Sequence, residues 1–253
     1  MADHMSAVEY AGRELESMAF AVNYHRWILE RFAPFLGKHI VEVGAGTGSF
    51  SMLLLETKPE SLTLLEPSNM YAALEKARIA EAHHCTLAQA KFSIRPDSIV
   101  YVNVLEHIED DQGELRIAHS ALAPGGRVLI FVPANPWLMG SIDRQLGHFR
   151  RYTMNELMSK CRAAGFGIRS SSYFDVAGIL PWWIKYCVFK SERMEPAAVR
   201  FYDRWVVPWQ DFWKGWCCRQ SGKTSFLSPK SPCRRSFPFL RRSVKLKPNL
   251  GQN

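Results

Sequence analysis

The sequence lacks the features of membrane-spanning, secreted and disulfide-stapled proteins. No apolar run approaches the roughly 20 residues that a membrane-spanning helix needs. Residues 1–18 hold no basic segment followed by an apolar one, so we expect no secretory signal. The six cysteines show neither a CxxC pair nor the pattern of a small disulfide framework, which favours reduced thiols and a cytoplasmic location.

Acidic residues are absent from the last part of the chain. Residues 217–253 hold nine Lys and Arg but no Asp or Glu, whereas residues 1–216 hold 23 basic and 24 acidic residues. We therefore expect one nearly neutral domain over 1–216, and a basic, Ser- and Pro-rich tail over 217–253 that is largely disordered. Because the positive charge is confined to this tail, we expect no nucleic-acid partner.

The 253 residues, 47% of them hydrophobic and 22% charged, can build a sizeable globular core, in which strand-like and helix-like segments alternate. Short apolar runs predict strands over 38–43, 61–66, 97–104, 127–133 and 165–174. Helical spacing predicts helices over 8–33, 49–57, 68–80 and 114–122, and one that begins at the capping box Thr153–Glu156. This alternation is typical of an α/β fold with a mostly parallel sheet buried on both faces.

A glycine-rich turn, Glu42 to Gly48, joins the first predicted strand to the next helix. Glycine lets a ligand approach the backbone closely, and a helix N-terminus offers free N–H groups. Parallel sheets bind ligands at the carboxyl ends of their strands, which is where this turn lies. A dinucleotide turn needs the pattern G-x-G-x-x-G, but Ser49 stands at the position of the third glycine.

The turn and two later segments resemble the class I S-adenosylmethionine (SAM) dependent methyltransferases. The pattern E-x-G-x-G-x-G resembles motif I of that family. Residues 97–111 resemble its fourth strand with the Leu-Glu-His turn, and 122–134 resemble its L-x-P-G-G turn and fifth strand. Residues 21–28 and 147–157 are similar to a bacterial branch that acts on small molecules, so the resemblance covers about residues 8–216. It implies a Rossmann-like, mostly parallel seven-stranded sheet with helices on both faces.

The sequence departs from this family at two places. The resemblance implies an acidic residue near the adenine amino group after the third strand, where this chain has Gln89. It also implies an apolar, antiparallel last strand, whereas the candidate segment 222–228 is short and polar. The last strand is therefore degraded or uncertain.

The resemblance implies SAM as the cofactor and places its contacts at the strand ends. Glu42 is expected to accept from the ammonium group, the glycine-rich turn to hold the amino-acid tail, and Glu66 to bind the ribose diol. The expected cofactor contacts are Tyr24, Glu42, Gly44, Ala45, Gly46, Gly48, Glu66, Pro67, Gln89, Asn103 and Val104.

Two histidines are candidates for a general base that takes a proton from the methyl acceptor. His107 follows the fourth strand and could instead cap the next helix; His148 could instead be satisfied by a neighbouring helix. The expected acceptor contacts are Arg151, Tyr152, Phe174 and Trp182. We expect no metal site, because His83 and His84 precede a short strand without a second cluster of ligands.

Aromatic residues gather in 173–216, which holds 13 of the 31 aromatics and six of the eight Trp. This segment could be a lid over the acceptor, a surface that enters lipid headgroups, or ordinary packing of the last helices. Peripheral membrane contact through this segment and the basic tail is therefore a further expectation.

The sequence as a whole predicts an enzyme that transfers a methyl group from SAM to an oxygen atom of a small molecule. Two alternatives stay open at this point. One is an NAD-dependent oxidoreductase on a Rossmann fold, which would use the same turn and acidic residue. The other is a SAM-binding or membrane-associated protein with impaired catalysis.

Overall fold

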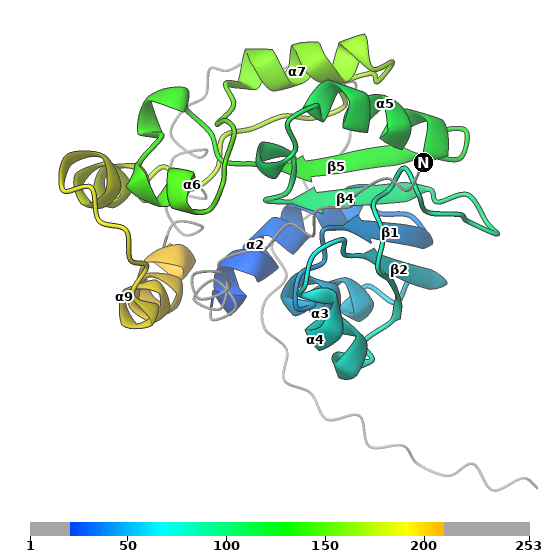
Figure 1. Ribbon diagram of the computed structural model, residues 1–253, viewed down its shortest axis with the longest axis horizontal. Helices are drawn as coiled ribbons and strands as arrows, with labels where there is room; N and C mark the ends of the chain where they lie inside the picture. Colours follow the sequence, from blue (N-terminus) through cyan, green and yellow to red (C-terminus); the bar gives the residue numbers. More distant parts are fainter. Residues whose placement is uncertain (1–20, 210–253) are drawn as a thin grey trace, which may run out of the picture.

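A five-stranded parallel sheet forms the centre of the computed structural model, which describes residues 21–209 (Figure 1). Its strands are β1 (His39–Val43), β2 (Ser61–Leu65), β3 (Glu81–His83), β4 (Ser98–Val102) and β5 (Arg127–Phe131). They lie in the order β3-β2-β1-β4-β5, and every neighbouring pair is parallel. The chain moves outward from β1 to β3 and then crosses to β4, so β1 and β4 flank the switch point where such sheets bind ligands.

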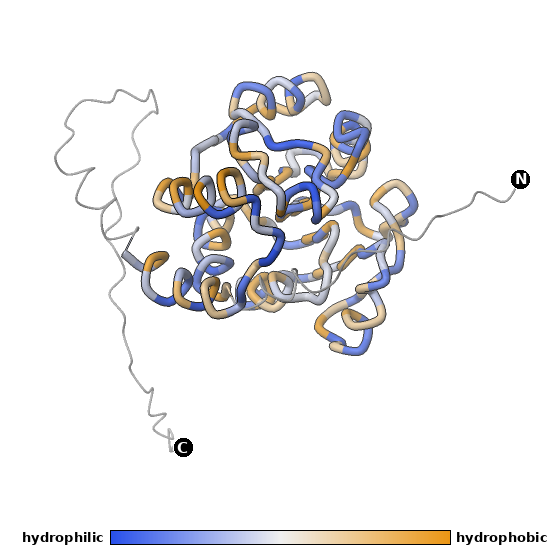
Figure 2. The backbone as a smooth tube through the Cα atoms, turned by 60° about the vertical axis from the view of Figure 1, so that its left-hand side comes forward, coloured by the Kyte–Doolittle hydropathy of each residue, from blue (hydrophilic) through white to orange (hydrophobic). Residues whose placement is uncertain are grey.

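Helices cover both faces of the sheet. The helical elements before β5 are α2 (Val22–Phe32), η1 (Ala33–Phe35), α3 (Ser49–Glu56), α4 (Tyr71–Ala77), η2 (Leu105–His107) and α5 (Asp111–Ala121). Those after it are η3 (Pro136–Leu138), α6 (Ser141–Gln145), α7 (Met154–Ala163), α8 (Ile179–Trp182), η4 (Trp183–Val188), α9 (Pro196–Phe201) and η5 (Tyr202–Val206). Figure 2 shows hydrophilic and hydrophobic colours side by side along the helices, as expected for elements buried on one side.

Alternating strand residues build two separate cores. Val41 and Val43 of β1 point to the face covered by α5 and α7, where they pack with Leu115. Ile40 of the same strand points to the opposite face, where it packs with Leu54 of α3. Glu42 shares that opposite face with Ile40, so the fold buries a carboxylate beside an apolar core.

Most of the predicted elements are confirmed. The four strands expected over 38–43, 61–66, 97–104 and 127–133 form within a few residues of the expected bounds. The short strand expected after His84 forms just before it, as β3. Thr153 caps α7 by accepting a hydrogen bond from the Glu156 backbone N–H at 3.2 Å.

The strand expected over 165–174 is wrong. Gly165 adopts φ +100° after α7, and the segment then runs without regular structure and with most side chains exposed. Phe166, Ile168 and Phe174 pack on the two cores, but the three serines at 170–172 between them give no apolar face to bury. Within residues 21–209 the sheet therefore has five strands, and the candidate strand 222–228 lies outside the described residues.

The late helices lie beyond the carboxyl ends of the strands, with α6 and α9 at the end toward which the arrows point in Figure 1. One of their residues, Asp203, holds the start of α2. Its carboxylate accepts from the backbone N–H groups of Asn23 at 3.1 Å and Tyr24 at 2.7 Å. It thus serves as an N-cap supplied from another element. Across residues 21–209, no helix combines the length and apolar character needed to cross a membrane.

Candidate active site

A cavity of about 1410 Å³ extends from the carboxyl ends of β1, β2 and β4 along the whole of β5 to residues 122–126, which precede that strand. Its wall includes all the predicted cofactor and acceptor residues except Gly48 and Gln89. The residues brought together in this way come from positions as distant in sequence as Tyr24 and Trp182. The switch point of the sheet therefore lies in the wall of a space large enough for two small molecules.

The glycine-rich turn forms the floor of the cavity. The backbone N–H groups of Gly44 and Ala45 donate to the Leu65 carbonyl at 2.8 and 3.1 Å, which bends the chain at the end of β1. Gly44 has φ +67°, and a Cβ atom there would lie 2.7 Å from Cγ2 of Val104. A side chain at this position would both strain the backbone and collide with the end of β4, so only glycine fits.

Glu66, at the end of β2, is almost fully buried beside this turn. Its two carboxylate oxygens accept from the backbone N–H groups of Gly46 at 2.7 Å and Ser68 at 2.9 Å. The carboxylate therefore ties the glycine-rich turn to the next strand as well as lining the cavity. Each oxygen keeps a second lone pair with which to accept from a ligand.

Glu42 carries a second buried carboxyl group at the cavity wall. Burial raises its pKa to about 8, against which a 2.5 Å hydrogen bond donated by the Ser51 hydroxyl acts only in part. The group is therefore protonated at neutral pH in the free protein. A cation placed beside it would favour the carboxylate form.

Gly48 and Gln89 lie outside the cavity wall. A Cβ atom on Gly48 would lie 2.3 Å from Cδ1 of Ile79, so this glycine lets α3 pack closely against its neighbours. The Gln89 side-chain oxygen accepts from the Thr86 backbone N–H at 3.0 Å, and the residue lines a separate, smaller cavity of about 250 Å³. The geometry therefore gives both residues a local structural role, and their contact with a cofactor stays a prediction.

The end of β4 and the turn after it supply further wall residues, among them Asn103 and Glu106. Asn103 adopts φ +54° and donates its backbone N–H to the Phe131 carbonyl at 2.8 Å, which fixes the turn into η2. Glu106 in η2 is fully buried, and burial raises its pKa to about 8. Its backbone carbonyl accepts from the Phe149 N–H at 2.8 Å, so the chain around His148 is held against η2.

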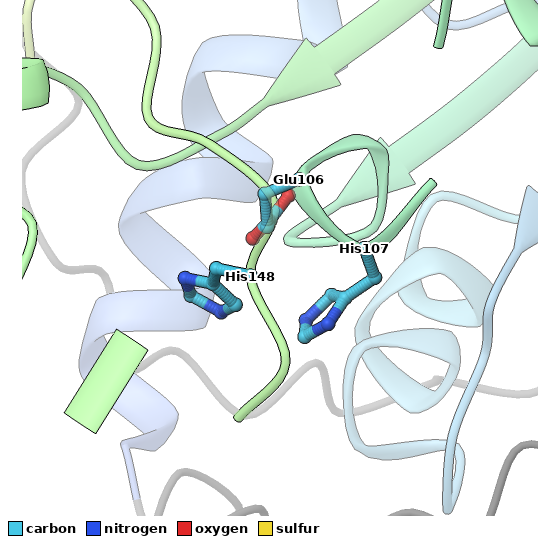
Figure 3. Close-up of side chains that lie close together, drawn as sticks. All are labelled: Glu106, His107 and His148. Carbon is cyan, nitrogen blue, oxygen red and sulfur yellow. The ribbon is translucent and has the colours of Figure 1, made fainter. Parts of the chain in front are cut away.

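Both candidate bases lie in this corner of the cavity, with their rings at 85° to each other and their centroids 4.5 Å apart (Figure 3). Burial and the neighbouring His148 lower the pKa of His107 to about 3, although a hydrogen bond with the Leu146 backbone acts in the opposite direction. His107 is therefore neutral at physiological pH and a weak base. His148 is the better candidate for interaction with an acceptor hydroxyl.

Asp143 of α6 is a buried site residue that the sequence analysis missed. Its carboxylate accepts from His148 Nδ1 at 2.9 Å, from Arg151 Nε at 2.9 Å and from the Gly140 N–H at 2.7 Å. Burial opposes ionisation, but these hydrogen bonds and the charge of Arg151 lower the pKa of Asp143. A lone Asp in a short polar helix carries no sequence signal for such a role.

The expected acceptor contacts Arg151 and Tyr152 are already engaged by buried carboxylates. Arg151 pairs with Asp143 at 2.8 Å, and its Cζ lies 4.6 Å from the centroid of the Trp182 ring. The Tyr152 hydroxyl donates to Asp111 at 2.8 Å, which also binds Lys160 at 2.8 Å. Both side chains thus shape the cavity wall, and their contact with an acceptor stays a prediction.

Aromatic rings form the opposite wall. The Phe174 ring lies 3.7 Å from that of Trp27, 5.2 Å from that of Phe131 and 5.5 Å from that of Tyr24, measured between centroids. Trp182 also faces the cavity, and its indole N–H donates to the Leu138 carbonyl at 3.2 Å. By contrast, several large side chains of the late helices are exposed: Leu180, Trp183, Phe189, Phe201, Trp205 and Trp209. The aromatic segment thus combines a cavity wall with an exposed apolar surface.

Comparison with known proteins identifies the family. Residues 18–171, more than half of the chain, match the family model described as a methyltransferase domain. None of the curated proteins compared with this chain matches it. The chain therefore belongs to the methyltransferase domain family. It is a class I SAM-dependent methyltransferase, with SAM as its methyl donor.

Solved structures of low sequence identity share the fold. A chain from the complex between the Haloferax volcanii Trm112 methyltransferase activator and its candidate methyltransferase is 17% identical, with a TM-score of 0.57 over 66% of this chain and 78% of that one. A Thermotoga maritima SAM-dependent methyltransferase, described as a possible histamine N-methyltransferase, is 20% identical, with a TM-score of 0.52 over 61% and 76%. A Mesorhizobium loti SAM-dependent methyltransferase is 20% identical, with a TM-score of 0.50 over 62% and 88%.

Proposed function

We propose that this enzyme methylates an oxygen atom of a small molecule bound in the cavity at the ends of β1, β4 and β5. One observation carries the proposal: the turn with its obligatory glycine, two buried carboxyl groups and a histidine pair all line a single space of about 1410 Å³. The part of this cavity at the strand ends is concave and lined by apolar side chains with a few polar groups, which suits a small-molecule acceptor.

The residues present fit SAM. The bare backbone at Gly44, Ala45 and Gly46 leaves room for the amino-acid tail, because a Cβ atom at Gly44 would fill that approach. Glu42 would accept from the ammonium group, and Glu66 from the ribose hydroxyls. When bound, SAM supplies a methyl carbon on a sulfonium; the acceptor oxygen forms a bond to that carbon as the carbon–sulfur bond breaks and the sulfur keeps the electron pair.

The chain's own contribution is to hold the acceptor and to deal with its proton. Correct placement of the two reacting atoms supplies roughly 7–11 kcal/mol of the barrier in well-oriented reactions. A hydroxyl must lose its proton as it is methylated, and His148, oriented by Asp143, lies in the cavity wall beside His107. This need for proton removal supports an oxygen acceptor.

Titration calorimetry with SAM tests the cofactor site, with NADH as the control ligand. We expect one SAM bound per folded chain and no binding of NADH, since the position of the third dinucleotide glycine is Ser49. Absence of SAM binding at millimolar concentration by a folded protein would contradict the proposal. Incubation with a cell extract and SAM carrying a labelled methyl group should then yield a small-molecule product with the label on oxygen, and label on nitrogen or on a macromolecule would contradict the acceptor class.

A further inference from the structure

The corner of the cavity between η2 and the chain after α6 holds a set of metal-binding side chains. One potential ligand atom each from Glu106, His107 and His148 lies within 4.8 Å of the other two. Figure 3 shows the three side chains converging, with Glu106 and His107 from the same turn and His148 from the neighbouring segment. Among the residues that the structure describes, no other group of three His, Cys, Asp or Glu side chains meets this condition.

Glu106 is the first reason to assign a ligand to this corner. Its side chain is fully buried, and neither carboxylate oxygen has a hydrogen-bond partner in another residue. A buried carboxyl group without a partner is destabilising, and native structures satisfy such groups with protein, water or an ion. The adjacent imidazoles place nitrogen ligands beside these oxygens, so a cation shared by all three side chains would satisfy Glu106.

Outer contacts orient both imidazoles as metal-binding histidines are oriented. Nδ1 of His148 lies 2.9 Å from Oδ1 of the buried Asp143, which leaves Nε2 as the nitrogen for an ion. His107 makes a hydrogen bond with the Leu146 backbone. A carboxylate or a backbone carbonyl behind each ligating ring is the usual second layer of a metal site, because it fixes the tautomer and the ring direction.

We propose that Glu106, His107 and His148 bind a divalent first-row transition-metal ion at the acceptor end of the cavity. Two imidazoles and one carboxylate suit Zn²⁺, Fe²⁺, Co²⁺ or Mn²⁺ better than Mg²⁺, which prefers oxygen ligands throughout. Three protein ligands leave coordination positions for an acceptor oxygen. An ion bound there lowers the pKa of that hydroxyl, whose proton passes to solvent, and His148 is then a ligand instead of a base. This role in the reaction rests on the proposed function, but binding of the ion does not.

Cobalt provides a direct probe of the site. The full-length protein is treated with EDTA, desalted and titrated with Co²⁺ while visible absorption and calorimetry are recorded. We expect one Co²⁺ per chain and a spectrum without the intense charge-transfer band of thiolate ligands, which separates this site from the six cysteines. X-ray absorption of the bound cobalt should show two imidazoles in the wild-type protein.

Matched variants locate the bound ion. Glu106→Gln and His148→Gln keep side-chain size close to the original and should each weaken Co²⁺ binding at least tenfold, since even second-layer changes weaken metal sites 10–100-fold. His83→Gln is the control, because His83 is an exposed imidazole 3.1 Å from Glu81, outside the cavity. Circular dichroism checks that each variant is folded. Where a variant does not fold, the X-ray absorption spectrum of cobalt bound to the wild-type protein still tests whether two imidazoles are ligands.

The outcomes separate this inference from the proposed function. A folded wild-type protein that does not bind millimolar Co²⁺, a spectrum without two imidazoles, or unchanged affinity in folded Glu106→Gln and His148→Gln overturns the metal site. SAM calorimetry on the metal-free protein is run in parallel. If the protein binds SAM but does not bind Co²⁺, only the metal site is overturned. If it binds Co²⁺ but does not bind SAM, only the proposed function is overturned.

Discussion

Replacing Glu42 with Gln should change the pH dependence of stability in a way that can be calculated. In the folded protein the pKa of Glu42 is about 8, against an ordinary value of 4.5. Between these two values the folded state holds a proton that the unfolded state has released, so stability falls as the pH rises from 4.5 to 8. The full penalty above pH 8 is about 5 kcal/mol, at 1.36 kcal/mol per pKa unit.

The experiment compares the wild-type protein with Glu42→Gln between pH 6 and pH 8, without ligand. Over this interval Glu42 should remove about 2 kcal/mol from the wild-type stability, or roughly 4–8 °C in Tm for a domain of this size. Gln has no proton to lose and can still accept from the Ser51 hydroxyl, so the variant should lack this part of the slope. Glu106 contributes equally to both proteins and cancels in the difference. Urea unfolding at each pH measures the difference in unfolding free energy between the two proteins.

A matched control and a ligand complete this test. Glu30→Gln changes an exposed carboxylate on α2 and should leave the slope of the wild-type protein unaltered. Saturating SAM should raise the unfolding free energy of the wild-type protein most at pH 8, because the SAM ammonium pairs with the Glu42 carboxylate. The increase should be smaller for the Gln variant. Parallel pH profiles for the wild type and Glu42→Gln would refute the reasoning.

Three further changes test other parts of the site. Glu66→Ala should weaken SAM binding about tenfold or more in calorimetry, because hydrogen bonds to a charged group are worth about 1.5–3 kcal/mol; unchanged affinity would remove Glu66 from the cofactor site. Gly44→Ala should abolish SAM binding and lower Tm, since its Cβ would lie 2.7 Å from Val104, whereas Gly125→Ala, also at positive φ but with open space around it, should keep SAM binding; equal effects would show that backbone strain alone matters. Asp143→Asn should destabilise the protein by about 3 kcal/mol in urea unfolding, because it leaves a buried guanidinium without its charge partner; a loss below 1 kcal/mol would contradict this.

The parts of the site that lie at strand ends could be predicted from the sequence. The glycine-rich turn and Glu66 follow directly from strands whose β-branched, apolar pattern is unambiguous, and parallel pairing then brings their ends together. Local chemistry is sufficient for such features. Gln89 shows the limit of this reasoning, because a turn contact with Thr86 takes up its side chain.

The sequence could not reveal contacts that depend on how distant segments pack. Asp143 meets His148 and Arg151 only because the chain folds back after α6, and nothing in its neighbours marks it. Likewise Glu106 and His148 are 42 positions apart, and the backbone hydrogen bond between Glu106 and Phe149 sets their proximity. The strand predicted over 165–174 was wrong for a local reason. Its alternation of apolar and polar residues is weak, and the segment pairs with no neighbouring strand.

The carboxylate that caps α2 comes from 180 positions further along the chain. Asp203 thereby acts as a clasp between the two extremities of the described fold, and Tyr24, which it secures, is also part of the cavity wall. A truncation before position 203 would therefore remove the cap of α2 as well as the C-terminal residues. Any truncation meant to isolate the methyl-transferring region should keep Asp203, because its loss would also disturb the cavity wall at Tyr24.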